Sequence, residues 1–349
     1  MALLDVDDLD VRFYTEEGVV QAVDGLSYSV DRGERVGIVG ESGAGKSVAA
    51  RSILRLVDDP GRIEGGSVRL DGEDLLDASA DRLREVRGGA VGMAFQDPEA
   101  ALDPVYTVGE QVAEAVRVHT GHEGAWDRAV SLLDRVGIPD PERRATDYPH
   151  QFSGGMAQRA VVAMALAGDP DLLVADEPTT GLDVTVQAQL LDVLDGLATD
   201  LDLGVLLVSH DLGVVAEFCD RVVVLYAGRA VERAPVEDLF YRPKHPYTAG
   251  LLSAVPRVGD DRDRLPTVPG SMPDLADVPP GCRFHPRCPY AEEVCTRRSP
   301  PLADVRDEDA TADADGPHAH RAACLAYTGD LDGDLGFRVV VDETGGDDR

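Results

Sequence analysis

Residues 40–47 read Gly40-Glu41-Ser42-Gly43-Ala44-Gly45-Lys46-Ser47 and form a complete G-x-x-x-x-G-K-[ST] phosphate loop. The apolar run at 35–39 predicts a short buried strand before the loop, and residues 48–56 predict a helix after it. In this context the glycines let backbone N–H groups converge on phosphate oxygens, and the helix N-terminus adds its positive dipole. Lys46 is expected to reach the β- and γ-phosphates, and Ser47 to bind Mg²⁺. The alternative, a chance glycine-rich turn, is disfavoured by the complete motif in this context.

The composition is strongly acidic, with 65 Asp and Glu against 33 Lys and Arg and a formal net charge of −32 over 349 residues. Lys46 is one of only two lysines. Acidic residues are spread along the whole chain, which is typical of a surface that stays hydrated in high salt. We therefore attribute the charge to a salt-loving, halophilic source. The shortage of basic surface argues against sequence-independent nucleic-acid binding.

The sequence holds no candidate membrane span, since no stretch approaches the about 18 consecutive apolar residues that a span requires. The N-terminus also lacks the apolar segment of a signal peptide. We therefore expect the chain to stay in the cytosol, with other polypeptides supplying the spans if it works at a membrane.

Three zones differ in texture along the chain. Residues 1–235 alternate short apolar strands with amphipathic helices, which predicts an α/β domain. Residues 236–328 are Pro-rich, bear cysteines and are sparse in apolar residues, so we expect a small domain that needs a metal or docking to hold its shape. Residues 329–349 form an acidic tail. Within the first zone the expected elements are strands at 172–175, 205–208 and 222–225, and a helical subdomain at about 97–160 with helices at 108–118 and 125–136.

Two further motifs make the phosphate loop more specific. The strand at 172–175 ends in Asp176-Glu177, which places Asp176 beside the loop as a Mg²⁺ ligand and Glu177 where it can polarise the attacking water. Ser153-Gly154-Gly155 opens a helix and predicts a second anion site made from backbone amides. Each motif alone is common, but the three in this order are a strong signal.

With these motifs the chain resembles the ATP-binding-cassette (ABC) ATPases, because Ser153-Gly154-Gly155-Met156-Ala157-Gln158 matches their signature. The resemblance implies an ABC-type P-loop NTPase fold of class α/β, with a RecA-like core, an antiparallel β subdomain and a helical subdomain. It also implies ATP and Mg²⁺ as cofactors. Gln96 matches the Q-loop glutamine, Asp183 lies in the matching D-loop, and His210 matches the switch histidine that contacts the γ-phosphate. Individually, each of these three could be an ordinary turn or strand-end residue.

The resemblance further implies that two such domains pair head-to-tail, with each ATP between the phosphate loop of one and the signature face of the other. Tyr14 is the expected adenine-stacking residue, with Phe13 as the competitor. The implied roles are as follows: catalysis by Glu177, His210, Asp183 and Lys46; ATP binding by Tyr14, residues 40–47 and Gln96; Mg²⁺ binding by Ser47, Gln96 and Asp176; and contact with the partner's ATP by Ser153, Gly154, Gly155 and Gln158.

Four of the five cysteines lie in the last fifth of the chain: Cys282, Cys288, Cys295 and Cys324. Stable disulfides are disfavoured in the cytosol, so these thiols suggest a metal centre. Their spacing lacks the C-x₂₋₄-C pairs of typical zinc sites, and it leaves zinc, an iron–sulfur cluster and unliganded buried cysteines all open. His285 and His320 lie close enough to be substitute ligands, whereas Cys219 is expected to be a small core residue.

The C-terminal sequence resembles one subfamily more closely. Residues 244–256, 269–271 and 281–289 look like the C-terminal segment of the oligopeptide/dipeptide importer ATPases. This implies a [4Fe–4S] cluster on the four cysteines. It also implies a second ABC ATPase subunit, itself or a paralogue, two membrane permeases contacted by the helical insert, and an extracellular solute-binding protein. The protein would then be peripheral, at the cytoplasmic face of the cell membrane.

Two function classes follow from the sequence. The leading one is the ATP-hydrolysing, energy-coupling subunit of a peptide importer, and close relatives by resemblance also move nickel or sugars such as oligosaccharides. The other is a soluble, non-transport ABC ATPase of DNA repair or translation. Such proteins usually carry two cassettes or a long coiled coil, and neither is present in this sequence. The solute and the dimer partner cannot be read from this chain.

Overall fold

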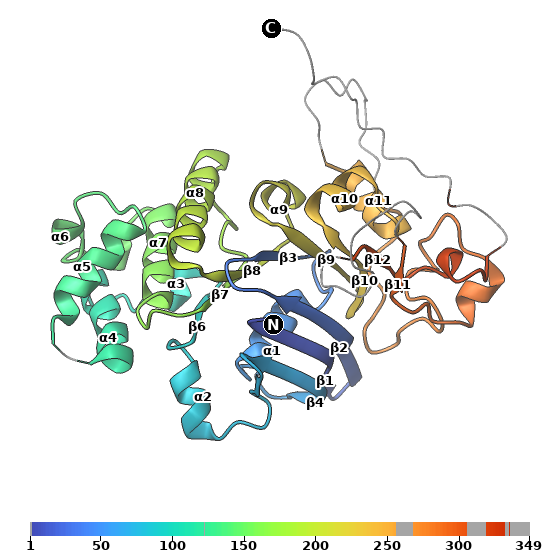
Figure 1. Ribbon diagram of the computed structural model, residues 1–349, viewed down its shortest axis with the longest axis horizontal. Helices are drawn as coiled ribbons and strands as arrows, with labels where there is room; N and C mark the ends of the chain where they lie inside the picture. Colours follow the sequence, from blue (N-terminus) through green and yellow to red (C-terminus); the bar gives the residue numbers. More distant parts are fainter. Residues whose placement is uncertain (1, 122, 256–267, 306–318, 332–334, 336–349) are drawn as a thin grey trace, which may run out of the picture.

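The centre of the molecule is an eight-stranded mixed sheet in the order β11-β12-β10-β9-β3-β8-β7-β6. The computed structural model describes all residues except 1, 122, 256–267, 306–318, 332–334 and 336–349 (Figure 1). The strands are β3 (Arg35–Val39), β6 (Val91–Ala94), β7 (Leu172–Asp176), β8 (Gly204–Ser209), β9 (Arg221–Tyr226), β10 (Arg229–Pro235), β11 (Ala303–Asp304) and β12 (Arg321–Ala322).

The five strands from β9 to β6 are parallel, and their side chains form near-continuous apolar runs. In β7, β8 and β9 every residue is buried, as expected for parallel strands covered on both faces. The strands predicted at 35–39, 172–175, 205–208 and 222–225 are confirmed. The helix predicted after the phosphate loop is α1 (Lys46–Ile53), which begins directly after Gly45.

A second, antiparallel sheet packs beside the first in the order β2-β1-β4-β5. It is built from β1 (Leu4–Thr15), β2 (Gly18–Val30), β4 (Gly61–Leu70) and β5 (Glu73–Asp74). Its inward residues, such as Val6 and Leu26, share one apolar core with α1 and with the facing side chains Ile38 and Val223 of the main sheet. The phosphate loop is therefore held between two sheets, which fixes its backbone.

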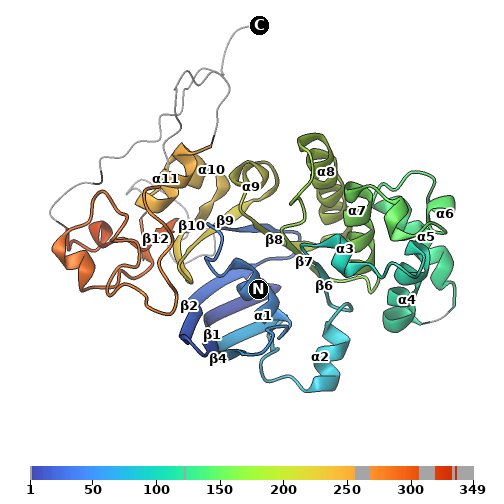
Figure 2. The same cartoon turned by 180° about the vertical axis from the view of Figure 1, so that it is seen from behind.

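A helical region extends from the β6 edge of the main sheet (Figures 1 and 2). Helix α4 begins with a capping box, in which Thr107 and Glu110 satisfy each other's backbone N–H groups, and it packs on α5 and α7. The helices predicted at 108–118 and 125–136 are confirmed as α4 and α5. The helices between β5 and β9 in chain order are α2 (Ala80–Val86), α3 (Pro98–Ala101), α4 (Val108–Thr120), α5 (Ala125–Arg135), α6 (Pro141–Arg144), η1 (Pro149–Gln151), α7 (Gly154–Ala165), α8 (Val184–Leu201) and α9 (Leu212–Phe218), of which α9 lies beside α10 (Val236–Tyr241) and not in the helical region (Figure 1).

The C-terminal region lies at the other end of the main sheet, away from the helical region (Figure 1). Strand β12 pairs with β10 through Glu232↔Ala322, and β11 extends the sheet by one more strand. Residues after 235 therefore share the sheet of the preceding domain, and the domain limits proposed from the sequence stay a prediction. The helices here are α10 (Val236–Tyr241), α11 (Pro246–Ser253), η2 (Glu293–Thr296) and η3 (Leu325–Tyr327). Most of the predicted acidic tail lies outside the described residues.

Candidate functional site

The phosphate loop connects β3 to α1 and depends on glycine at two close approaches. A Cβ on Gly40 would lie 2.3 Å from the Leu225 carbonyl oxygen, and one on Gly45 would lie 2.2 Å from that of Ala22. Both glycines have positive φ, 157° and 102°, so both space and backbone conformation exclude larger residues there. A Cβ on Gly43 would meet no atom within 4 Å, so the curve of the loop opens on free space. Such a loop at a helix N-terminus can receive phosphate oxygens.

Lys46 is folded back onto the loop. Its Nζ donates to the carbonyl oxygens of Gly40 at 3.0 Å and Glu41 at 3.2 Å, and lies 3.7 Å from Glu177 Oε1. Burial lowers the pKa of Lys46, while the carboxylates of Glu177 and Asp176 act in the opposite direction. A phosphate arriving at the loop would offer this buried ammonium a full negative charge in place of carbonyl dipoles.

Asp176 is a fully buried carboxylate at the end of β7. Its Oδ1 accepts a hydrogen bond from Ser47 Oγ at 2.9 Å, whereas its Oδ2 is buried with no hydrogen-bond partner among the described residues. Burial raises the pKa of Asp176, because the Arg51 guanidinium, with Nε 4.0 Å from Oδ2, and the Ser47 hydrogen bond do not offset the loss of water. An orphaned buried carboxylate oxygen beside a hydroxyl fits the oxygen ligands of Mg²⁺.

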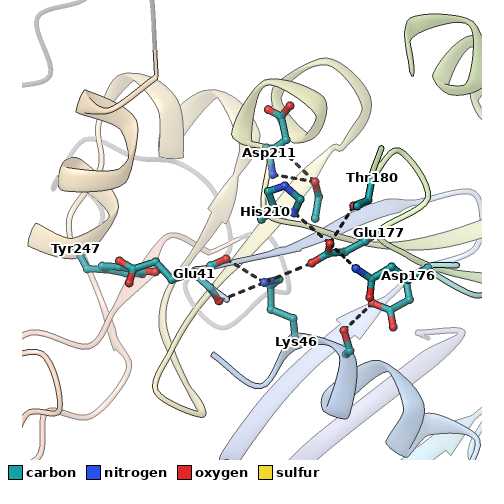
Figure 3. A network of polar contacts seen from close by, with 12 residues as sticks. Glu41, Lys46, Asp176, Glu177, Thr180, His210, Asp211 and Tyr247 are labelled. Atoms are coloured by element: carbon teal, nitrogen blue, oxygen red, sulfur yellow. Dashed lines mark hydrogen bonds and ion pairs between the residues drawn. The ribbon is translucent and has the colours of Figure 1, made fainter. Parts of the chain in front are cut away.

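Glu177 is the centre of the polar network drawn in Figure 3. Its Oε2 accepts hydrogen bonds from Gln96 Nε2 at 3.1 Å and Thr180 Oγ1 at 3.0 Å, and lies 3.1 Å from His210 Nδ1. The backbone of Glu177 has a φ of 49°, in the left-handed region that a non-glycine residue seldom adopts. Such strain is concentrated at functional sites, where surrounding structure holds it.

The structure thus joins residues from four strand ends. Lys46 and Ser47 follow β3, Gln96 follows β6, Glu177 follows β7, and His210 follows β8. Because these strands are parallel, their carboxyl ends meet along one edge of the sheet, which is where ligands of open α/β sheets bind. Together these groups supply a phosphate cradle, a Mg²⁺ position and a carboxylate that can orient water.

The Ser-Gly-Gly motif begins α7 in the helical region. Ser153 is its N-cap and accepts a hydrogen bond from the Met156 N–H at 3.3 Å. Ser153 and Gly154 are exposed, so the free backbone N–H groups of the helix start face outward. Gly155 is buried, and a Cβ there would lie 2.3 Å from Val186 Cγ1 of α8.

Comparison with known proteins decides the family. Residues 23–180 match the family described as "ABC transporter", and residues 231–295 match "Oligopeptide/dipeptide transporter, C-terminal region". A relative from Brucella abortus, named as a peptide import ATP-binding protein, is 52% identical over 300 residues, covering 85% of this chain and 90% of the relative. The chain belongs to the ABC transporter ATP-binding family.

Other relatives agree with this assignment. The oligopeptide transport ATP-binding protein OppD of Mycobacterium tuberculosis is 50% identical over 327 residues, covering 93% of this chain and 52% of that protein. Among solved structures, the dimeric ABC cassette MJ0796 bound to ADP and Pi superposes with a TM-score of 0.60 at 27% identity, covering 67% of this chain and 98% of that one. The fold is therefore the ABC cassette, and the protein is an ATP-hydrolysing enzyme.

Two ABC-motif residues do not face the phosphate loop. Asp183 is the N-cap of α8, where its Oδ1 accepts from the N–H groups of Thr185 and Val186, each at 3.0 Å. Gln158 is 2% exposed, and its Nε2 lies 3.5 Å from the Phe95 carbonyl oxygen, next to the Q-loop. The side chain of Gln158 therefore points inward from the exposed start of α7. The contact of Gln158 with the partner's ATP stays a prediction.

Adenine stacking requires an exposed aromatic ring, and Tyr14 and Phe13 differ in exposure. Tyr14 is 44% exposed at the end of β1, and its Oη donates to Glu64 at 2.9 Å, a bond that raises the pKa of Tyr14. The Arg62 guanidinium lies over its ring at 5.5 Å from the centroid. Phe13 instead packs against the core, where its ring would block a Cβ on Gly61. The exposed ring of Tyr14 keeps it the preferred candidate.

The four C-terminal cysteines lie near one another. The Cys282 N–H donates to the Cys295 carbonyl oxygen at 2.9 Å. The thiols of Cys282, Cys288 and Cys324 each lie close enough to another thiol of the set to interact with it electrostatically. Burial raises the pKa of Cys282 to about 11 and that of Cys288 to about 12. Nevertheless, within the described ranges no group of three or more His, Cys, Asp or Glu side chains is arranged to hold a metal ion. The described part of the chain therefore gives no support to a metal centre on these cysteines.

The histidines near these cysteines have other partners. His320 Nε2 lies 2.7 Å from Glu232 Oε1, and His285 Nδ1 lies 2.9 Å from the Cys282 carbonyl oxygen. Cys219 is 5% exposed in the apolar core, which confirms the prediction made for it. In the part of the chain that the structure describes, no helix has the length and apolar character of a membrane span.

Sequence reasoning missed three residues that contact this site. Thr180 donates to Glu177, while Tyr247 and Arg287 hold Glu41 of the phosphate loop. Thr180 lies three residues after Glu177, and this short spacing is the sequence signal that indicates a hydrogen bond between the two side chains. Tyr247 and Arg287 lie more than 200 residues from the loop, and no local pattern indicates their contacts.

Proposed function

We propose that this ATPase is the energy-coupling subunit of a peptide importer. The observation that carries the proposal is the match of residues 231–295 to the oligopeptide/dipeptide transporter C-terminal region, together with relatives about half identical that bear peptide import names. Peptides are therefore favoured over other solutes. The protein would act from the cytoplasmic face of the membrane with two permease subunits and an extracellular solute-binding protein.

In the proposed mechanism two ATPase subunits, identical or paralogous, close head-to-tail around ATP. The phosphate loop and Lys46 of one subunit bind the β- and γ-phosphates, and the exposed backbone amides after Ser153 of the other complete the anion site. Mg²⁺ bound by Ser47 and Asp176 would neutralise phosphate charge. Glu177 orients the attacking water and takes its proton, and His210 supports this carboxylate at 3.1 Å. Hydrolysis is then gated by closure of the pair.

The helical region is the proposed contact with the permeases. Just before α4 it exposes two neighbouring apolar side chains that a permease contact would bury, Val105 at 69% and Tyr106 at 55% exposed. Gln96 lies at the entrance to this region and also touches Glu177. A movement of the helical region against the permeases would therefore shift the Gln96 side chain and, through it, the position of the Glu177 carboxylate.

We further propose that Cys282, Cys288, Cys295 and Cys324 hold an iron–sulfur cluster. Support comes from the match of residues 231–295, which contain three of these cysteines, to the oligopeptide/dipeptide transporter C-terminal region, and from the burial that raises the pKa of Cys282, Cys288 and Cys324. Bound iron would hold these side chains as thiolates and offset the cost of burying their negative charge. Anaerobically purified protein should contain iron and sulfide. Fully active protein that contains zinc, or no metal, would exclude the cluster.

The experiment that tests the importer assignment is identification of the membrane proteins that co-purify with the tagged chain from its source. We expect two permeases and an associated solute-binding protein, and the binding protein should take up peptides from a panel that also contains nickel and oligosaccharides. Co-purification with ribosomes or DNA-repair proteins, and no permease, would instead support a non-transport ATPase.

A further inference from the structure

The second residue of the phosphate loop is held by a residue of the C-terminal region. Arg287 makes two parallel hydrogen bonds to the Glu41 carboxylate, Nη1 to Oε2 at 3.0 Å and Nη2 to Oε1 at 3.1 Å. Its Nε donates to the Pro269 carbonyl oxygen at 2.7 Å, and its side chain is only 6% exposed. Such a bidentate pair fixes both position and orientation, which a single contact does not.

The backbone of the same residue is held as well. The Glu41 N–H donates to Tyr247 Oη at 2.9 Å (Figure 3). Tyr247 is fully buried in α11, with its ring 4.6 Å from the centroid of Tyr226 and 5.5 Å from that of Phe284. The aromatic cluster thus gives the hydroxyl one fixed location.

Through Glu41, these contacts also affect Lys46, the residue expected to bind the β- and γ-phosphates. The carbonyl oxygen of Glu41 accepts a hydrogen bond from Lys46 Nζ at 3.2 Å, so the placement of Glu41 sets where the ammonium rests. The Glu41 carboxylate would also repel a polyphosphate in the loop unless a cation neutralised it. Burial alone would lower the pKa of Arg287, but its hydrogen bonds to Glu41 and Tyr226 raise it, so the guanidinium keeps its charge here.

We propose that Arg287 and Tyr247 are positioning residues of the ATP site, through which the C-terminal region controls the affinity of the phosphate loop for ATP. The C-terminal region is then part of the nucleotide-binding machinery, besides any role in transport. This inference depends on the ATPase reaction and not on the transported solute or on a metal at the cysteines.

The test compares Arg287→Lys and Tyr247→Phe with a matched control, Arg221→Lys, in the full-length protein. Arg221 is also buried and bidentate, with Nε and Nη2 at 2.8 and 2.9 Å from Glu34, but it lies at the opposite end of β9 from the loop. Lysine keeps the charge and loses the fork of donors. Tyr247→Phe removes one oxygen and leaves the aromatic packing.

For Arg287→Lys and Tyr247→Phe we expect the KM for ATP to rise about tenfold, which is the size of effect expected for residues in direct contact with the loop. The kcat of both variants should stay within about twofold of wild type. The control should keep its KM even if its melting temperature falls. A purely structural role would lower the active fraction, and therefore kcat, with an unchanged KM. That result, or an equal rise of KM in Arg221→Lys, would overturn the proposal. If Arg287→Lys does not fold, the KM of Tyr247→Phe alone decides.

Discussion

Replacing Glu177 by glutamine removes the proton acceptor and leaves the shape of the site. Gln96, Thr180 and His210 converge on Glu177 Oε2 at 3.0–3.1 Å, and they can still contact an amide oxygen. General-base catalysis contributes about 10²- to 10⁴-fold to a rate, or about 2.7–5.4 kcal/mol of barrier. We therefore expect kcat of Glu177→Gln to fall by that factor.

The same change should not weaken ATP binding. Glu177 Oε1 lies 3.7 Å from Lys46 Nζ, so Coulomb's law gives an attraction of about 1 kcal/mol at the dielectric constant of water and about 4.5 kcal/mol at an effective value of about 20. A γ-phosphate competes with this attraction for the ammonium. Without it, ATP affinity should be equal to wild type or a few-fold tighter, and the closed dimer should accumulate.

The assay measures phosphate release at saturating Mg²⁺-ATP, ATP affinity by titration calorimetry, and dimer content by gel filtration. Glu99→Gln, an exposed carboxylate of α3, is the control and should behave as wild type. Wild-type turnover by Glu177→Gln would refute the catalytic assignment. Loss of both turnover and ATP binding would show that the carboxylate is needed for the structure of the site and not for the chemistry.

Three further predictions follow. Asp176→Asn should stabilise the nucleotide-free protein at neutral pH, which a higher melting temperature would show. The reason is that burial raises the pKa of Asp176 above its unfolded value, so the stabilising contribution of this carboxyl group is present at acid pH and lost as pH rises through the folded pKa. The variant should also lose the Mg²⁺-dependent rise in melting temperature with ATP. An unchanged rise would contradict the role of Asp176 as a Mg²⁺ ligand. Ser153→Arg, on the exposed start of α7, should leave ATP binding unchanged in calorimetry but lower ATPase activity by about 10²-fold or more, since it blocks the anion site offered to the partner; full activity would argue against a composite site. With a formal net charge of −32, the melting temperature should rise between 0.15 and 1 M KCl, as the screening length falls from about 8 to about 3 Å; a constant or falling value would remove the case for a halophilic surface.

The centre of the site could be predicted because its signals are local. The loop at 40–47 and the pair Asp176-Glu177 each follow an apolar strand, and parallel strands bring their carboxyl ends to one edge. The structure accordingly places Ser47 at 2.9 Å from Asp176 and Lys46 at 3.7 Å from Glu177.

The remaining features depend on contacts that are distant in sequence. Strands β11 and β12 have two residues each, too few for any periodicity, and they exist because the edge of β10 is available for pairing. The inward orientation of Gln158 results from helix packing that its motif does not specify. The Arg287–Glu41 pair joins residues 246 positions apart, and it is visible only when the C-terminal region is folded onto the loop.

The central claim is that ATP hydrolysis at Lys46 and Glu177 drives peptide import through membrane permeases. It is tested most directly by the ATPase rate of the chain reconstituted with its permeases in lipid vesicles, with and without peptide-loaded binding protein on the opposite side. We expect the rate to rise several-fold with the loaded binding protein and not with the peptide-free one. A rate that ignores both permeases and peptide, and rises with nucleic acid or ribosomes, would contradict the account.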